Sequence, residues 1–247
     1  MVSSELWKTA ADYLPTPDIP SNTIPEAQIP TPDELQGLTE QAKQGDTASL
    51  LRLGEIYDLG LGVPASAQDA MQCYQAAANA DDAEAFYRLG LFYINGRHVK
   101  KSLDNAAPYL VAAAERGHAK AMNLLALDYS LGGDGKNALL YYDKAARLGV
   151  IRSQLALGDL FHTGYRGIVS PNSQYSLYWY CRAYLQGSKD AAQRLNKLIA
   201  SPRKFQGGLL RVKEMLQMIT DEEIEPPTIL FVKKKKRHFW KRKAAKN

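Results

Sequence analysis

Two cysteines and four histidines are the residues of this 247-residue sequence best suited to nucleophilic or metal chemistry. A reactive cysteine needs a base or a positive charge that stabilises its thiolate, and a metal site needs several ligands close together. The histidines are His98, His118, His162 and His238. None of them is followed by a ligand-type residue three or four positions later. Cys73 and Cys181 fall in helical segments, where we expect buried structural thiols. We therefore predict no metal site and no cysteine nucleophile.

Two glycine-rich segments, Gly60–Gly62 and Gly132–Gly135, raise the question of phosphate binding. Phosphate-binding loops follow strands, and the nucleotide-binding form reads Gly-x4-Gly-Lys-Ser/Thr, which does not occur in this sequence. Both segments follow predicted helices, so we interpret them as turns. The sequence indicates no catalytic residue, no metal and no cofactor, and we expect no enzymatic activity.

The composition is that of a folded protein, with 45% apolar and 23% charged residues. No apolar run approaches the ~18 residues of a membrane helix, and Met1–Leu14 lacks the apolar core of a signal peptide. Two cysteines cannot form a disulfide framework, which favours a reducing compartment and a cytoplasmic location. The net charge of +5 is unevenly distributed. Residues 233–247 hold seven Lys and two Arg, which is +9, whereas residues 1–232 hold 22 basic and 26 acidic residues, which is −4.

A repeat with a period of about 36 residues dominates the middle of the chain. Its marker is a Leu-Gly-like pair, found at Leu53-Gly54, Leu89-Gly90, Leu125-Ala126 and Leu157-Gly158. An aromatic residue follows each pair after three positions and a glycine after six, which predicts one helix face and a left-handed helix end. Equivalent positions further on hold Ser66, Ser102, Asp134 and Asn172, all good N-caps for a second helix. Each unit is therefore predicted to be a helix–turn–helix.

These units resemble the Sel-1-like repeat family, relatives of the tetratricopeptide repeat. The family pattern Ala-x3-Leu-Gly-x2-Tyr-x2-Gly is matched from Ala85 to Gly96, and the second-helix pattern by Trp179-Tyr180. The paired cysteines of the relatives considered to be hydrolases are absent, so the resemblance implies no activity. Because one helix pair cannot bury its own apolar stripe, we predict an all-α, right-handed α-solenoid of about four to five repeats.

The predicted organisation has a leading helix, a repeat array, a closing helix and two extensions. The ranges are 1–30 (proline-rich arm), 31–46 (capping helix), 47–82, 83–118, 119–150 and 151–188 (repeats), 189–222 (degenerate repeat and cap) and 223–247 (basic tail). Thr31-Pro32-Asp33-Glu34 predicts the start of the capping helix. Leu209, Val212, Leu216 and Ile219 predict an amphipathic closing helix. We expect the extended arm and the disordered basic tail to lie outside the packed core.

The concave face of the solenoid is the first candidate binding surface, since the first helices of paired-helix solenoids line it. The residues predicted to share this stripe are Leu51, Glu55, Asp58, Tyr87, Leu91, Ile94, Asn123, Leu127, Ser130, Leu155, Asp159 and His162. The stripe has an apolar centre and polar ends. It is either an exposed groove for a peptide or helix, or ordinary core buried by tight curvature. The groove reading predicts a non-catalytic scaffold for an unidentified protein or peptide.

The basic tail and the arm are the other two candidate surfaces. The tail's polyanion-binding residues would be Lys233, Lys234, Lys235, Lys236, Arg237, Trp240, Lys241, Arg242 and Lys243. They could contact nucleic acid, an anionic membrane or acidic protein, or an import receptor, or only increase solubility. Ile-Pro recurs at residues 19, 24 and 29 of the arm, which could be a ligand for another protein or a plug for the chain's own groove. We expect a monomer.

Overall fold

The computed structural model describes residues 29–96, 99–165, 167–200, 208–222 and 224–229. Within these ranges the chain forms eleven helices and no strand beyond one isolated bridge between Tyr165 and Val169. The helices are α2 (Pro32–Lys43), α3 (Thr47–Leu59), α4 (Ala67–Asn79), α5 (Ala83–Asn95), α6 (Leu103–Glu115), α7 (Ala119–Leu131), α8 (Gly135–Arg147), α9 (Ile151–Thr163), α10 (Ser173–Leu185), α11 (Lys189–Ile199) and α12 (Gly208–Thr220). The arm up to residue 28 and the basic tail lie outside the described residues.

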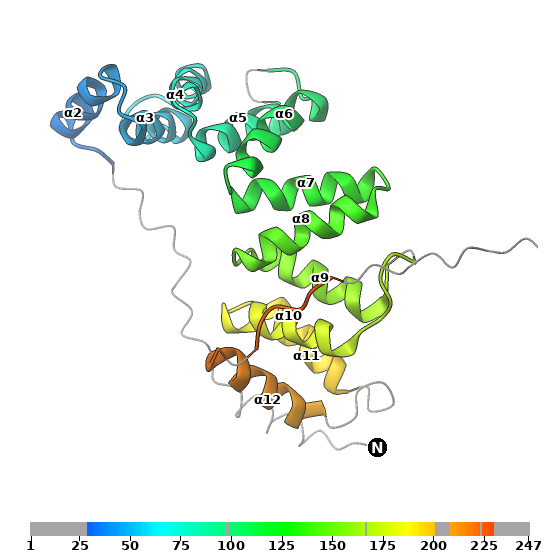
Figure 1. Cartoon of the computed structure of the whole chain (residues 1–247). Coiled ribbons are helices and arrows are strands. Elements are labelled where there is room, and N and C mark those ends of the chain that lie inside the picture. Colours follow the sequence, from blue (N-terminus) through cyan, green and yellow to red (C-terminus); the bar gives the residue numbers. More distant parts are fainter. Residues whose placement is uncertain (1–28, 97–98, 166, 201–207, 223, 230–247) are drawn as a thin grey trace, which may run out of the picture.

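The helices stack in chain order along a curved path, from α2 at one end to α12 at the other (Figure 1). Helices α3, α5, α7 and α9 are the first helices of the four repeats, and each packs against the second helix that follows it. Each second helix then packs against the first helix of the next repeat. The predicted all-α solenoid is confirmed. None of the described helices has the length and apolar character needed to cross a bilayer.

The second helices begin where their N-cap residues predict. The side chains of Ser66, Ser102 and Asp134 each accept a hydrogen bond from the backbone N–H three residues later, at 3.3, 3.1 and 3.2 Å. Asn172 caps α10 in the same way at 3.1 Å. These bonds satisfy an N–H group that the helix leaves unpaired. The capping box predicted at Thr31 is also present.

The helix ends agree with the glycine pattern in two repeats and depart from it in the other two. Gly60 (φ 69°) and Gly96 (φ 71°) take the left-handed conformation expected after a helix. The prediction for Gly132 is wrong, because its φ is −70° and Gly133 (φ 85°) makes the left-handed turn instead. The short loop there moves the turn by one residue. Gly164 has φ 77° but ψ 162°, so its chain leaves the helix extended.

The Leu-Gly pairs join the two helices of a repeat. The leucines lie in the core, with Leu89 and Leu157 fully buried. Because each of these glycines lacks a side chain, the second helix can cross the first one closely at that point. A Cβ on Gly54 would lie 2.5 Å from the ring of Tyr74, and Gly158 faces Tyr180 more closely still. The small glycine therefore lets a large buried tyrosine cross the first helix.

The C-terminal end of the described chain closes the array. Val212, Leu216 and Ile219 of α12 are buried against the core, as the apolar stripe predicted. The segment 224–229 then runs back over the last repeats (Figure 1). It is held there by Arg147, which donates a hydrogen bond of 3.0 Å to the carbonyl oxygen of Pro227. Helix α12 thus packs against α10 and α11, and the segment after it contacts α8 through Arg147.

Candidate partner-binding surface

The twelve residues predicted to line the concave face lie on the four first helices α3, α5, α7 and α9, and we call them the first-helix surface. Leu127 and His162 are exposed, and Leu155 is buried with 9% exposure. The other nine are half-buried, namely Leu51, Glu55, Asp58, Tyr87, Leu91, Ile94, Asn123, Ser130 and Asp159. Leu155 therefore belongs to the core, whereas most of the surface keeps contact with solvent.

Two positions of the repeat set the character of this surface. The residue directly after the Leu-Gly pair is Glu55, Leu91, Leu127 or Asp159 in successive repeats. The residue directly before the pair in the following repeat is Arg88, Leu124, Ala156 or Arg194. Both ends of the array therefore carry an acid followed by an arginine, and the middle carries apolar residues. The backbone repeats while the side-chain chemistry changes along it.

At the C-terminal end Asp159 organises a polar network. Its carboxylate accepts hydrogen bonds from Nε and Nη2 of Arg194 at 2.9 and 3.1 Å, and from the hydroxyl of Tyr180 at 2.7 Å. Burial raises the pKa of Tyr180, and the hydrogen bond to Asp159 raises it further. The ion pair raises the pKa of Arg194, so its guanidinium stays charged.

A cavity of about 370 Å³ opens beside this network. Its lining residues are Asp159, His162, Tyr180, Gln193, Arg194, Lys197 and Leu198. They come from α9, α10 and α11. The structure thus brings two of the predicted residues, Asp159 and His162, to one cavity. Arg194 and Lys197 were not among the predicted site residues, although Arg194 holds the same repeat position as Arg52 and Arg88.

At the N-terminal end the charges are paired with one another. Arg52 and Glu55 lie 2.6 Å apart, and Arg88 and Glu84 lie 2.5 Å apart. Glu84 also contacts Nε2 of His118 at 2.8 Å, and this hydrogen bond is the main reason its pKa is lowered to about 2. This end of the surface therefore holds ion pairs within α3 and α5, and the hydrogen bond between His118 and Glu84 joins α5 to the start of α7.

Several predicted binding residues also hold the repeats together. The ring of Tyr87 stacks on that of His118 with 4.3 Å between centroids. Ser153 donates a hydrogen bond of 2.8 Å to Asn123, and the hydroxyls of Ser130 and Tyr165 are 3.3 Å apart. Each partner lies about one repeat further along the chain. Tyr87, Asn123 and Ser130 therefore have a structural role, which leaves Leu91 and Leu127 as the clearest candidates for contact with a partner.

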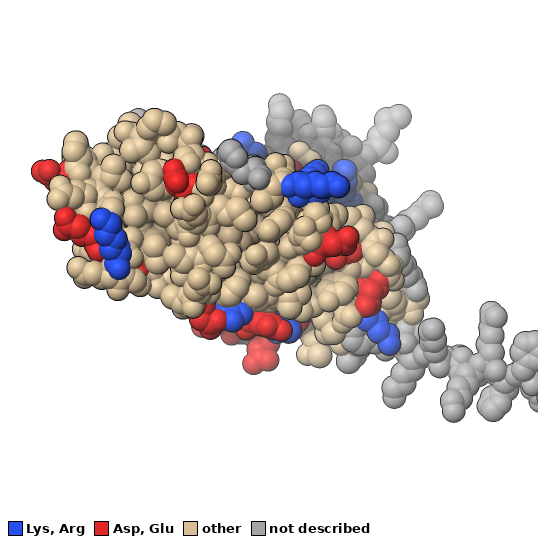
Figure 2. All heavy atoms as spheres, turned by 90° about the horizontal axis from the view of Figure 1, so that it is seen from above, with Lys and Arg blue, Asp and Glu red and all other residues tan. Residues whose placement is uncertain are grey.

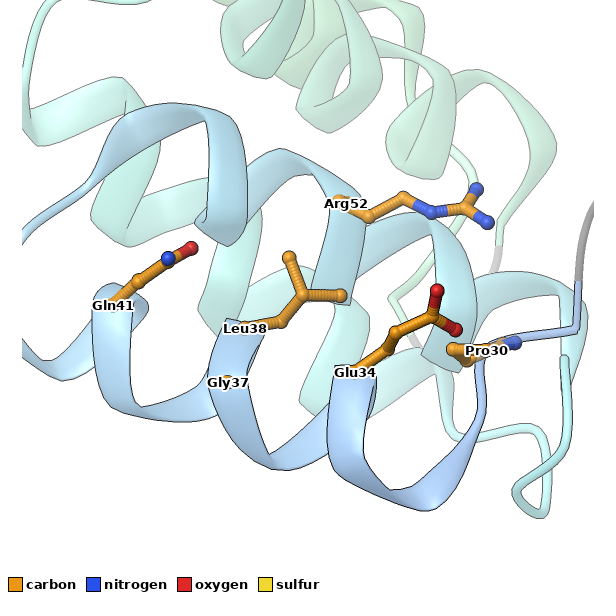
Figure 3. A pocket seen from close by; sticks show the side chains of 6 residues that line it. All are labelled: Pro30, Glu34, Gly37, Leu38, Gln41 and Arg52. Carbon is orange, nitrogen blue, oxygen red and sulfur yellow. The ribbon is translucent and has the colours of Figure 1, made fainter.

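A second cavity, of about 430 Å³, lies at the N-terminal end between α2 and α3 (Figure 3). Its lining residues are Pro30, Glu34, Gly37, Leu38, Gln41 and Arg52. Arg52 projects from α3 on one side, and Glu34 and Leu38 project from α2 on the other. The Glu34 carboxylate already accepts the backbone N–H of Thr31 at 2.7 Å. That carboxylate is therefore part of the capping box of α2.

Burial and helix capping explain the surroundings of both cysteines and of His118. Cys181 is fully buried and Cys73 half-buried, and burial raises the pKa of both thiols. His118 caps α7, its Nδ1 accepting the N–H of Ala121 at 3.1 Å. No three metal-binding side chains come together in the part of the chain that the structure describes. His98 and His238 lie outside it.

The charged side chains of the described residues are mixed rather than segregated on the face seen in Figure 2. Acidic and basic groups lie close to one another on a mostly uncharged surface. A protein that binds nucleic acid through its folded domain usually presents a basic patch or stripe. This face carries none among the residues described. The candidate polyanion-binding residues 233–243 lie outside the described part of the chain.

The comparisons with known proteins agree with the repeat pattern. The family model described as Sel1 repeat matches residues 47–82, 83–118, 119–150 and 151–188. A Sel1 repeat protein from Oxalobacter formigenes has 28% identity and a TM-score of 0.65, over 77% of either chain. The protective antigen c5321 of uropathogenic Escherichia coli, which displays an SLR fold, has 24% identity and a TM-score of 0.62. That similarity covers 76% of this chain and 41% of the antigen. Among curated proteins there is no match.

Proposed function

The chain belongs to the Sel1 repeat family, and on that basis we propose that it is a non-catalytic scaffold that holds a protein partner on its first-helix surface. Proteins with this fold are generally scaffolds for protein–protein interaction. The partner proposed here is a peptide or a helix with an apolar face. It would lie along α5 and α7, the two first helices in the middle of the array.

The observation that supports this proposal is the exposure of Leu127 in the middle of the surface. Leu127 is 48% exposed, whereas Leu125, two residues earlier on the opposite side of α7, is 3% exposed. Leu91 and Leu124 hold neighbouring positions of the repeat pattern and are half-buried. An exposed leucine flanked by half-buried apolar side chains, with polar groups at both ends, is the arrangement expected of a surface that binds an apolar face of another protein.

The test is affinity purification of crosslinked partners with the full chain. Leu127→Glu places a charge on the surface and should remove the partners, while circular dichroism should show an unchanged helix content. Leu140→Glu is the matched control, because Leu140 is 44% exposed but lies on the second helix α8. Partners that survive Leu127→Glu and are lost with Leu140→Glu would move the site to the outside of the solenoid. Tyr87→Ala is a poorer probe, since Tyr87 supports His118.

The basic tail is the second candidate, favoured by its charge of +9 in 15 residues. A tail that contacts nucleic acid or an anionic membrane should bind with an affinity that falls steeply as salt rises. We expect this binding to vanish in a chain that ends at Ile229. Partners kept by the shortened chain belong to the repeats. The free thiols Cys73 and Cys181 favour a cytoplasmic setting, and we propose that the chain acts there as a monomer.

A further inference from the structure

The cavity between α9, α10 and α11 carries more positive than negative charge. Arg194 and Lys197 lie one helical turn apart on α11, and His162 lies on α9. Asp159 is the single acid that lines it. With a neutral histidine the lining therefore has one net positive charge, from two basic groups and one carboxylate. A cavity of this kind favours an anionic group.

The positive groups of the cavity keep hydrogen-bond donors that no group in the described part of the chain occupies. Asp159 binds one edge of the Arg194 guanidinium, and Nη1 of Arg194 reaches the carbonyl oxygen of Asp190 at 3.4 Å. A guanidinium has five N–H groups, so donors on both terminal nitrogens are left over. The Arg194 side chain is 33% exposed. Lys197 and His162 are exposed, and neither has a hydrogen-bond or ion-pair partner among the described residues. Three side chains with available donors therefore line the same cavity.

We infer that this cavity binds a carboxylate of the partner that lies on the first-helix surface. The inference rests on the proposed function, and it adds the chemistry of one end of the partner. Asp159 holds the planar guanidinium in place, and such a fork matches the two oxygens of a carboxylate. Lys197 adds a point charge, and Tyr180 and Leu198 supply an apolar wall. Asp190 also acts on the charge of Arg194, so the site favours the single negative charge of a carboxylate over a phosphate group, which carries close to two charges.

The site also predicts the orientation in which the partner binds along the first-helix surface. The other end of the first-helix surface holds Glu55 and Glu84 in ion pairs, and the middle is apolar. A bound peptide would therefore place an acidic side chain or its own C-terminal carboxylate on α11, with apolar residues toward α7.

The test is an NMR titration of the ¹⁵N-labelled full chain with three synthetic peptides. The first is acetyl-Leu-Leu-Ala-Glu-Glu with an amidated C-terminus, and the second has Gln in place of both Glu. The third is the Gln peptide with a free C-terminus, which separates a C-terminal carboxylate from an acidic side chain. We expect the Glu peptide or the free-ended peptide to shift amides around the cavity on α9 and α11. The amidated Gln peptide should bind about ten-fold more weakly, and added salt should weaken only the charged peptides.

Variants of one exposed lysine complete the experiment. Lys197→Gln should weaken the charged peptide several-fold and Lys197→Glu more strongly, while Lys189→Gln, also exposed on α11, should change nothing. Equal binding of all peptides, shifts outside the cavity, no shift at all, or equal effects of Lys197→Gln and Lys189→Gln would each overturn the carboxylate site. The scaffold would still stand in these cases if Leu127→Glu removes the captured partners. If instead the charged peptides bind at the cavity as expected but Leu127→Glu keeps the captured partners, the carboxylate site would stand and the proposed binding surface on α5 and α7 would be refuted.

Discussion

The crossing of Gly54 and Tyr74 allows a quantitative test of what holds each repeat together. A Cβ built on Gly54 lies 2.5 Å from Cε1 and 2.8 Å from Cδ1 of Tyr74. Carbon atoms in contact prefer about 3.5–4.0 Å, so the overlap is about 1 Å. Tyr74 is 1% exposed and cannot turn away into solvent. Gly54→Ala must therefore push the two helices apart or force the ring out of its rotamer.

The expected magnitude follows from two opposing effects. Alanine is favoured over glycine in a helix by about 1 kcal/mol, whereas overpacking a core costs about 1–3 kcal/mol. Gly54→Ala should therefore lower the free energy of unfolding by up to about 2 kcal/mol. Gly37→Ala in α2 is the matched control, because no atom lies within 4 Å of its Cβ position. It should raise the free energy by up to about 1 kcal/mol. Gly90→Ala should fall between them, since it meets the movable end of Leu110 at 2.9 Å.

Urea unfolding followed by circular dichroism measures these differences, provided that the slope m is the same in all variants. The most informative quantity is the difference in unfolding free energy between Gly37→Ala and Gly54→Ala, which equals the overpacking cost of about 1–3 kcal/mol. Replacing the ring with Tyr74→Leu should reduce the cost of adding Gly54→Ala, which a double-mutant cycle detects. If Gly54→Ala stabilised the protein as much as Gly37→Ala does, the close approach of α3 and α4 would not require glycine at position 54.

Three further predictions follow from single residues. The pKa of Glu84 is lowered from 4.5 to about 2, so its stabilising effect is complete above pH 4.5 and is lost as the pH falls toward 2. Because this side chain is 36% exposed, the difference in unfolding free energy between the wild type and Glu84→Gln should shrink by only about 1 kcal/mol over that range. Pro108 is exposed inside α6, and Pro108→Ala should stabilise the protein by about 1 kcal/mol, measured by urea unfolding, because it restores a backbone hydrogen bond. Iodoacetamide should label Cys73 in the folded protein and Cys181 only after unfolding, as mass spectrometry of the labelled peptides would show.

The helix starts could be predicted from sequence because they depend on neighbours three residues away. A serine, asparagine or aspartate cap binds the backbone of its own helix, so Ser66 and Asn172 needed no knowledge of the fold. The helix ends could be predicted less well, because the residue that makes the turn depends on the length of the loop that follows. Gly60 and Gly96 behave as expected, but at Gly132 the loop is shorter and the turn falls on the next glycine.

The contacts between repeats could not be predicted, because they depend on how far one repeat is rotated against the next. Glu84 and His118 are 34 positions apart, and Asp159 and Arg194 are 35 apart. Many pairs have a spacing close to one period, and the sequence does not say which of them meet. The stripe on the first helices did place Asp159 and His162 together. The predicted stripe did not include Lys197, because α11 lies after the last clear repeat. In α11 the marker glycine is replaced by Asn196.

In this array the positions that pack in the core keep their residue type, whereas a neighbouring position changes its residue type from repeat to repeat. Leucine recurs at 53, 89, 125 and 157 because each side chain fills the same buried space. The residue two places after that leucine is Glu55, Leu91, Leu127 or Asp159, so packing imposes no single chemistry there. A position that keeps its geometry in every repeat while its polarity changes is available for selection by a partner. The order of these side chains, with acids at both ends and leucines between them, therefore carries the information that a bound peptide would have to match.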